Sequence, residues 1–394
     1  MIPVQARLAQ LQAQQAQQPQ KKANEPVGTE NIPRTRCGYI PHEVVQGFQK
    51  AICEAGTFST GRVLHFAADI VASGGISILV KLLWEYALLH IGIASPRIFV
   101  YLKQRLTDID DMTKRLPDEA LWTTEDFQIR IGEIILVLRE APTRSIMPWP
   151  KVGPETHDQS WIRGAITDPV TETAVVRKVW RPEGDMPLLR TAGAQLCKAI
   201  NDGSTEKALF WLKWLLEEEV MTRKYDKSVL STIQRGPANL TMRQRTDVSF
   251  FVIHLYAEMY KEFAAKQLVR MNEEFQTLLD MWKVPPKGVA GSARKQILVV
   301  LTQILSEVPR WKVPAAPTLI KDPVFLSRAV TQTPKFFKEV LAYAAPLNQN
   351  VLVKYFTKGK STVDTKVVVK AKQKDAAEEK MSALDQALDD YFNR

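Results

Sequence analysis

The chain has 394 residues, of which 45% are hydrophobic and 24% are charged, and 53 Lys and Arg against 43 Asp and Glu leave a net charge of +10. This amount of apolar material is enough for one large or two ordinary domains, so a wholly disordered chain is excluded. Three cysteines without paired spacing exclude a disulfide scaffold and fit an intracellular protein.

Residues 1–34 are rich in Gln and Ala and then in polar residues and Pro. They contain no charged start followed by an apolar core and a small-residue cleavage site, so they do not form a secretory signal. We expect a disordered arm, because such a composition offers little to pack. A helix formed against a partner stays an alternative for the first half of the arm.

Apolar residues recur at helical intervals over residues 35–140, which predicts a helical module. Its most apolar run, residues 76–94, approaches the length that spans a membrane but contains Lys81, Glu85 and His90. Lys81 and Glu85 are spaced to share one helix face. We therefore interpret the run as a buried helix and expect no membrane association.

Residues 56–63, "GTFSTGRV", contain two Gly at the spacing of a phosphate-binding loop. Arg62 and Val63 stand where Lys and Ser or Thr must contact phosphate and Mg²⁺, so no ATPase site is predicted. Cys37 and His42 could be two metal ligands, but no second pair follows at zinc-site spacing. Because no catalytic motif occurs either, we expect no enzyme, no metal and no cofactor.

Residues 141–187 are rich in Pro, which disfavours long helices. The step Asp168-Pro169 lies between β-branched stretches and predicts a small β-hairpin. We expect a connector that interrupts an otherwise all-α chain.

Helical spacing resumes over residues 188–353 and predicts a second helical module. Its clearest helix, "SARKQILVVLTQILSEV", has a core-facing stripe of apolar residues at spacings of three and four: Ile297, Val300, Leu301, Ile304, Leu305 and Val308. The segment before it predicts one long or two shorter helices, with Thr241 and Gln244 spaced as a capping box. The fold class is therefore all-α, with bundle-like modules, a small β-hairpin insert and disordered tails.

Two segments of the chain are similar to each other. Residues 48–56 and 62–71 resemble residues 196–203 and 207–216, because each pair has a helix containing "KAI", a break with Gly and an apolar-aromatic helix. An αα-hairpin used twice and a chance likeness of two amphipathic helix pairs are equally good explanations.

The same segments are similar to the C-terminal helical collar of clamp-loader-related AAA+ ATPases, especially the Werner-helicase-interacting/MgsA type. The similarity rests mainly on packing residues: Lys50, Ala51, Ile52, Leu64, Phe66, Ala67, Trp84, Glu85, Gly92 and Pro96. It implies collar-like helical modules, here without the ATPase motor.

Basic residues are concentrated at two places. Lys287, Arg294 and Lys295 lie near the start of the clearest helix, where free backbone N–H groups also favour anions. The tail, residues 354–394, opens with seven lysines against one acid: Lys354, Lys358, Lys360, Lys366, Lys370, Lys372 and Lys374. Both groups are predicted to contact nucleic-acid phosphates without reading sequence, and a merely soluble linker is the alternative for the tail.

The segment "DQALDDYF" near the end of the chain resembles the sliding-clamp (PCNA) binding box. Leu388 fills its aliphatic position and Tyr391 with Phe392 form its aromatic pair, whereas Asp385 stands where the family has Gln. The resemblance implies that one helical turn of the tail enters an apolar pocket of the clamp.

The same residues also resemble a second motif. Leu384, Asp385, Leu388, Asp389 and Tyr391 match the leucine-aspartate repeat with which mRNA-export adaptors bind their DEAD-box helicase. We prefer the clamp interpretation because the helical body independently resembles relatives of clamp loaders.

The sequence thus predicts a non-enzymatic accessory protein of DNA replication or repair, located in the nucleus or another site of replication. Its expected partners are PCNA, DNA and other replication proteins. The alternatives are an mRNA-export or transcription adaptor and, third, a structural scaffold.

Overall fold

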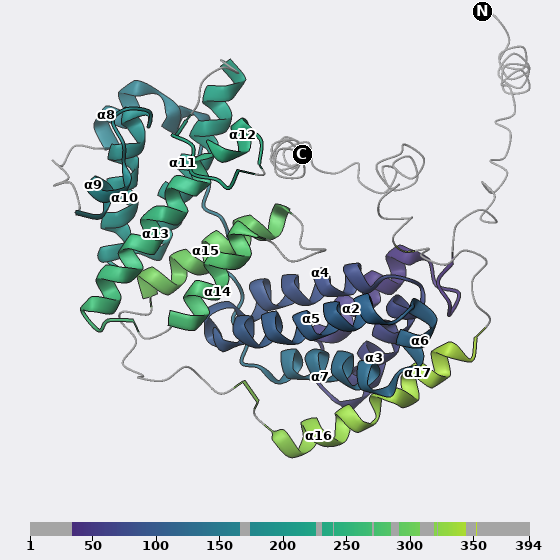
Figure 1. Ribbon diagram of the computed structural model, residues 1–394. Helices are drawn as coiled ribbons and strands as arrows, with labels where there is room; N and C mark the ends of the chain where they lie inside the picture. Colours follow the sequence, from purple (N-terminus) through teal and green to yellow (C-terminus); the bar gives the residue numbers. More distant parts are fainter. Residues whose placement is uncertain are drawn as a thin grey trace, which may run out of the picture.

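The computed structural model describes residues 34–165, 174–225, 231–238, 240–269, 272–284, 291–307, 319–320, 322–343 and 352. Every regular element within these residues is helical, which confirms the predicted all-α class. Figure 1 shows the helices in two lobes, with α14 and α15 between them.

The first lobe contains the helices that follow the N-terminal arm: α2 (Pro41–Cys53), α3 (Thr57–Ala72), α4 (Ile76–Tyr86), α5 (Arg97–Arg115), α6 (Asp118–Thr123) and α7 (Glu125–Glu140). The π-helix η2 (Ala87–Ile91) and the 3-10 helix η3 (Gly92–Ala94) continue α4. These elements share one core, in which Phe48, Trp84 and Phe127 are fully buried.

Two helices from the far end of the chain complete the first lobe. They are α16 (Pro323–Thr331) and α17 (Thr333–Leu341), which pack on α7 and α3 although they lie within the range expected for the second module. Phe337 and Val340 of α17 are fully buried. A Cβ on Gly132 of α7 would overlap the side chain of Thr333, so the missing side chain permits this close approach.

The second lobe contains the short 3-10 helix η4 (Pro154–His157) and the helices α8 (Gln159–Ala165), α9 (Ala174–Val179), α10 (Pro187–Asn201), α11 (Thr205–Tyr225), α12 (Met242–Arg245) and α13 (Val248–Ala265). Next in the chain are α14 (Asn272–Lys283) and α15 (Gly291–Glu307). α15 packs on α10, α11 and α13 of this lobe and on η2 and η3 of the first, while α14 packs on α5. The two lobes are therefore in direct contact.

The predicted stripe is confirmed for Ile297, Val300, Leu301, Ile304 and Leu305, which are buried, whereas Val308 lies outside the described residues. Leu298 and Val299 are buried as well, because α15 has neighbours on several sides. The capping box is also confirmed, since the Gln244 N–H donates to Thr241 Oγ1 and the Thr241 N–H donates to Gln244 Oε1. The segment before α15 folds as three helices, α12, α13 and α14, rather than one or two.

The two similar segments fold alike. α2 with α3 and α10 with α11 are both αα-hairpins, and each opens with Pro in its first turn. The breaks contain Gly56 and Gly203 at φ of 100° and 70°, a region that favours glycine. Both explanations of the sequence pattern require two such helix pairs, so the internal repeat stays a prediction.

The apolar run over residues 76–94 forms α4, η2 and η3. Among the described residues it is the one stretch long and apolar enough to cross a membrane, and 56% of it is buried inside the protein. Lys81 Nζ lies 3.6 Å from Glu85 Oε1, so these two residues share one helix face as predicted. The run packs against α3, α5 and α7 as part of the first lobe.

The predicted β-hairpin is not found. No described residue between 141 and 187 is in a strand, and Val175 and Val176, two branched residues after the Asp168-Pro169 step, belong to α9. Both valines are buried where α9 packs on α10 and α13, and this burial overrides the β-preference of branched side chains. Asp168 and Pro169 themselves lie outside the described residues.

Candidate phosphate-binding site

Most of the site residues predicted from the sequence cannot be placed. Asp385, Leu388, Tyr391 and Phe392 lie outside the described residues. So do Lys287 and all seven lysines of the tail. The clamp-binding segment and the basic tail therefore stay predictions.

Arg294 and Lys295 are placed, in the first turns of α15. The Arg294 guanidinium lies over the ring of Trp282, with 5.4 Å between its central carbon and the ring centroid, and Nη2 donates to the Lys283 carbonyl at 3.4 Å. Burial lowers the pKa of Arg294. Its main contacts are thus with the protein itself, and Lys295 beside it is half-buried.

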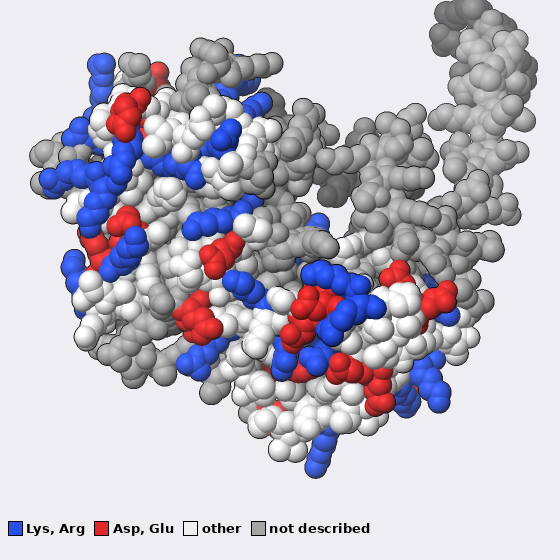
Figure 2. Space-filling model, viewed as in Figure 1, with Lys and Arg blue, Asp and Glu red and all other residues white. Residues whose placement is uncertain are grey.

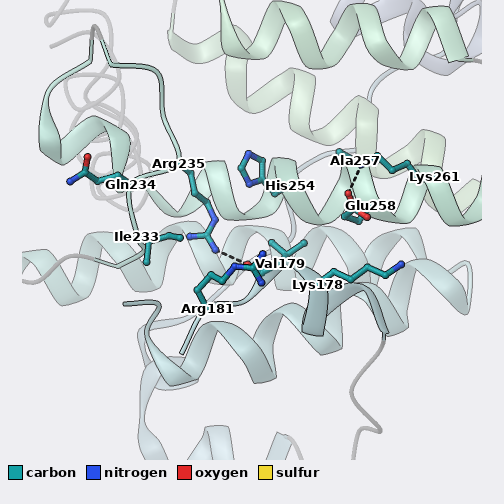
Figure 3. A pocket seen from close by; sticks show the side chains of 10 residues that line it. All are labelled: Lys178, Val179, Arg181, Ile233, Gln234, Arg235, His254, Ala257, Glu258 and Lys261. Carbon is teal, nitrogen blue, oxygen red and sulfur yellow. Dashed lines mark hydrogen bonds and ion pairs between the residues drawn. The ribbon is translucent and has the colours of Figure 1, made fainter. Parts of the chain in front are cut away.

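A different basic site is present in the second lobe. A pocket of about 690 Å³ lies between the end of α9, one side of α13 and residues 231–238 (Figure 3). Its lining residues are Lys178, Val179, Arg181, Ile233, Gln234, Arg235, His254, Ala257, Glu258 and Lys261. Four of these side chains are cationic and one is a carboxylate, so the lining favours an anion.

The floor of this pocket is a buried ion pair. Arg235 Nη1 and Nη2 lie 2.6 Å from Asp185 Oδ1 and Oδ2, and both side chains are almost fully buried. Asp185 also accepts the backbone N–H groups of Arg181 and Ile233, at 2.8 and 3.0 Å. Arg235 Nη2 donates to the Val179 carbonyl at 2.8 Å, as the dashed line in Figure 3 shows. Asp185 therefore balances the charge of Arg235 and joins the segments that form the pocket.

The remaining cations lie on the rim. Lys178 Nζ is 3.3 Å from Glu262 Oε1, Lys261 Nζ is 2.5 Å from Glu258 Oε1, and both lysines are more than half exposed. Such exposed ion pairs contribute little to stability, so a ligand can compete for these lysines. Arg181 is exposed, and no described residue forms an ion pair with it. Its guanidinium can therefore offer two parallel N–H donors to a phosphate.

His254 adds a neutral polar group to the wall of the pocket. Burial lowers its pKa, and the charges of Arg235 and Lys283 lower it further, against smaller opposing effects of Glu258 and Asp185. The imidazole is consequently neutral at pH 7, where one ring nitrogen donates and the other accepts. The pocket thus combines charged and neutral groups suited to phosphate and its neighbouring hydroxyls.

The phosphate-loop-like segment of the first lobe has a different role. Its residues belong to α3 from Thr57 onwards, Arg62 Nη1 lies 3.1 Å from Glu54 Oε2, and Val63 is fully buried. The two Gly therefore flank the first turns of a core helix. The segment does not wrap around an anion.

The part of the chain that the structure describes contains no cluster of side chains arranged to bind a metal ion. No group of three or more His, Cys, Asp and Glu side chains there could hold a metal ion. Burial and the nearby Asp69 carboxylate raise the pKa of Cys37 to about 12, so its thiol stays protonated. A thiol ligand must instead be deprotonated.

On the face shown in Figure 2, the second lobe carries more Lys and Arg than Asp and Glu, whereas the first lobe mixes both signs. The pocket therefore belongs to the more basic lobe. Comparison with known proteins found no match: no family model, curated protein or solved structure is similar to this chain. The resemblances to the clamp-loader collar and to the clamp-binding box stay predictions from sequence.

Proposed function

We propose that this protein is an accessory factor of DNA replication or repair, whose body contacts nucleic-acid phosphates and whose C-terminal segment docks on a sliding clamp. The observation that supports the first part is the cationic pocket of the second lobe, with Arg181 unpaired among the described residues. The second part is supported by the pattern of Leu388, Tyr391 and Phe392 at the end of the chain.

The chemistry of the pocket favours a phosphate backbone over a base-specific ligand. Its apolar lining is limited to Val179, Ile233 and Ala257, and His254 supplies the one aromatic ring among its lining residues, so it offers little surface on which bases would stack. The rim lysines and the guanidinium of Arg181, which has no ion-pair partner among the described residues, can neutralise phosphates without reading sequence. A net charge of +10 adds attraction at long range.

Replacing Arg181 by Glu is expected to weaken binding of a short fluorescein-labelled DNA duplex about tenfold or more, because the change turns a phosphate donor into a repelling charge. The slope of log affinity against log salt should fall by about one. Fluorescence anisotropy at several salt concentrations measures both quantities.

The matched control is Arg115→Glu, an equal change of charge at an exposed position at the end of α5 in the first lobe. It should leave affinity and salt slope nearly unchanged. Equal losses in both variants would mean that only the net charge matters, and the pocket would then have no specific role.

The clamp part of the proposal is tested on the peptide 383–394. Changing Tyr391 and Phe392 together to Ala should abolish its binding to PCNA, because each buried aromatic side chain contributes on the order of 1.5–3 kcal/mol. Isothermal titration calorimetry measures this binding.

Leu384→Ala separates the clamp interpretation from its alternative. The clamp box does not use Leu384, so this peptide should bind PCNA normally. Binding to a DEAD-box export helicase that needs Leu384 but not Phe392, without PCNA binding, would instead identify an mRNA-export adaptor. Binding to neither partner would leave the scaffold alternative.

A further inference from the structure

An apolar groove crosses the surface of the first lobe between α4, α5 and α6. It has a volume of about 540 Å³, and its walls include Ile76, Val80, Trp84, Leu106, Ile109 and Trp122. Ile76 and Val80 are only partly buried, so apolar surface faces the groove. A groove of this kind suits the apolar face of a short helix.

The two tryptophans of the groove have unused hydrogen-bonding capacity. Trp84 and Trp122 are almost fully buried, and neither indole N–H has an acceptor among the described residues. A buried donor without an acceptor is unfavourable. These donors are shielded from solvent, so the two tryptophans contribute ring surface to the groove.

The last described residue of the chain lies at the edge of the same groove. Leu352 is fully buried against Gly75, where an added Cβ would lie 2.6 Å from Leu352 Cδ1. Gly74 and Ile76, on either side of Gly75, line the groove. The chain is thus fixed at the groove's edge, and residues 353–394 continue from there.

We propose that residues 383–394 of this chain dock in the groove as a short amphipathic helix. Leu384, Leu388, Tyr391 and Phe392 follow one another at spacings of four, three and one, which places them on one helix face. Burying this face needs an apolar surface within reach. Asp389 and Asp390 lie on the opposite face and remain in water, away from the acidic Asp110 and Asp118 of the groove.

The length of the connecting chain permits this docking. Residues 353–382 separate Leu352 from the segment, and a random-coil chain of this length has an r.m.s. span of about 30 Å. Because the linker starts beside the groove, the effective concentration of the segment there is on the order of millimolar. A contact too weak to persist between separate molecules can therefore be occupied within one chain.

Docking would regulate the tail, because Leu388, Tyr391 and Phe392 cannot be in the groove and on an external partner at the same time. A clamp or any other partner that binds these side chains must compete with the groove. The groove of the first lobe would hold the segment whether or not the external partner is a clamp.

Photo-crosslinking of the full-length chain tests the inference. Benzoylphenylalanine at position 392, in place of Phe392, should crosslink on irradiation to peptides of α4, α5 or α6, as identified by mass spectrometry. The yield should not depend on protein concentration, because the contact is within one chain.

Two exposed positions on α5 provide a matched pair of variants. Thr107 lines the groove whereas Gln104 does not. Thr107→Arg should lower the crosslink yield about tenfold, because the long Arg side chain occupies space in the groove that the segment would fill. Gln104→Arg should leave the yield unchanged. Circular dichroism will show whether both variants keep the helical fold.

Three results would overturn the inference. Crosslinks confined to other parts of the chain would place the segment elsewhere, and equal yields in the two variants would show that the groove is not the contact. Crosslinks to an unlabelled chain ending at residue 382, when the two are mixed, would identify a contact between copies instead. Peptide binding to PCNA is measured separately, so failure of either proposal leaves the other testable.

Discussion

Asp185→Asn is expected to destabilise the protein by about 3–5 kcal/mol, because it leaves the Arg235 guanidinium buried without its counter-charge. Asp185 and Arg235 are almost fully buried and joined by two contacts of 2.6 Å. The same carboxylate accepts the backbone N–H groups of Arg181 and Ile233. Urea unfolding followed by circular dichroism measures the loss.

A surface pair provides the control for this measurement. Lys198 Nζ lies 2.8 Å from Asp202 Oδ2, and both side chains are about half exposed. Asp202→Asn should therefore cost less than about 1 kcal/mol. Adding Arg235→Met to Asp185→Asn should restore part of the lost stability, because the uncompensated charge is then removed. Similar small losses at Asp185 and Asp202 would contradict the structural role given to the buried pair.

The second large effect is a dependence of stability on pH that arises from His157. Burial alone would lower the pKa of this imidazole, but the hydrogen bonds that it donates to Glu217 and Glu218, together with their charges, outweigh burial and raise the pKa to about 9. Its Nδ1 lies 2.5 Å from Glu218 Oε2, and its ring stacks on Trp214 with 5.1 Å between centroids. These contacts hold η4, the short helix before α8, against α11.

The direction of this pH dependence follows from the state in which His157 binds its proton more tightly, which is the folded state. The folded-state pKa of His157 lies above its ordinary value of 6.5, so its stabilisation is complete below pH 6.5 and is lost as the pH rises through 9. The expected loss is about 2–3 kcal/mol. Urea unfolding across this pH range should show it as a falling difference in stability between the natural protein and His157→Gln.

His42→Gln is the control for the pH series, since His42 is an exposed histidine of α2. The difference between the natural protein and this variant should stay constant from pH 6.5 to 9. A constant difference for His157→Gln as well would show that the imidazole does not keep its proton through its contacts with Glu217 and Glu218.

The sequence by itself determined the all-α class and several contacts between residues close along the chain. The stripe of α15, the Thr241 and Gln244 capping box and the Lys81 and Glu85 pair all depend on spacings of three or four residues. Any helix brings such residues together, whatever else the chain does. The αα-hairpin pattern repeated in α2–α3 and α10–α11 is local in the same sense.

Only the tertiary structure decided which distant residues meet. The pocket floor joins Asp185 to Arg235, fifty positions apart, and Lys178 and Lys261 on its rim come from different helices. α17 packs on α3, and Arg36 Nη2 donates to the Leu341 carbonyl, 305 positions away, at 3.1 Å. The spacing of residues along a short stretch of sequence does not predict such contacts. Val175 and Val176 show the same limit, since burial against α10 and α13 makes helical a segment whose own preference is for strand.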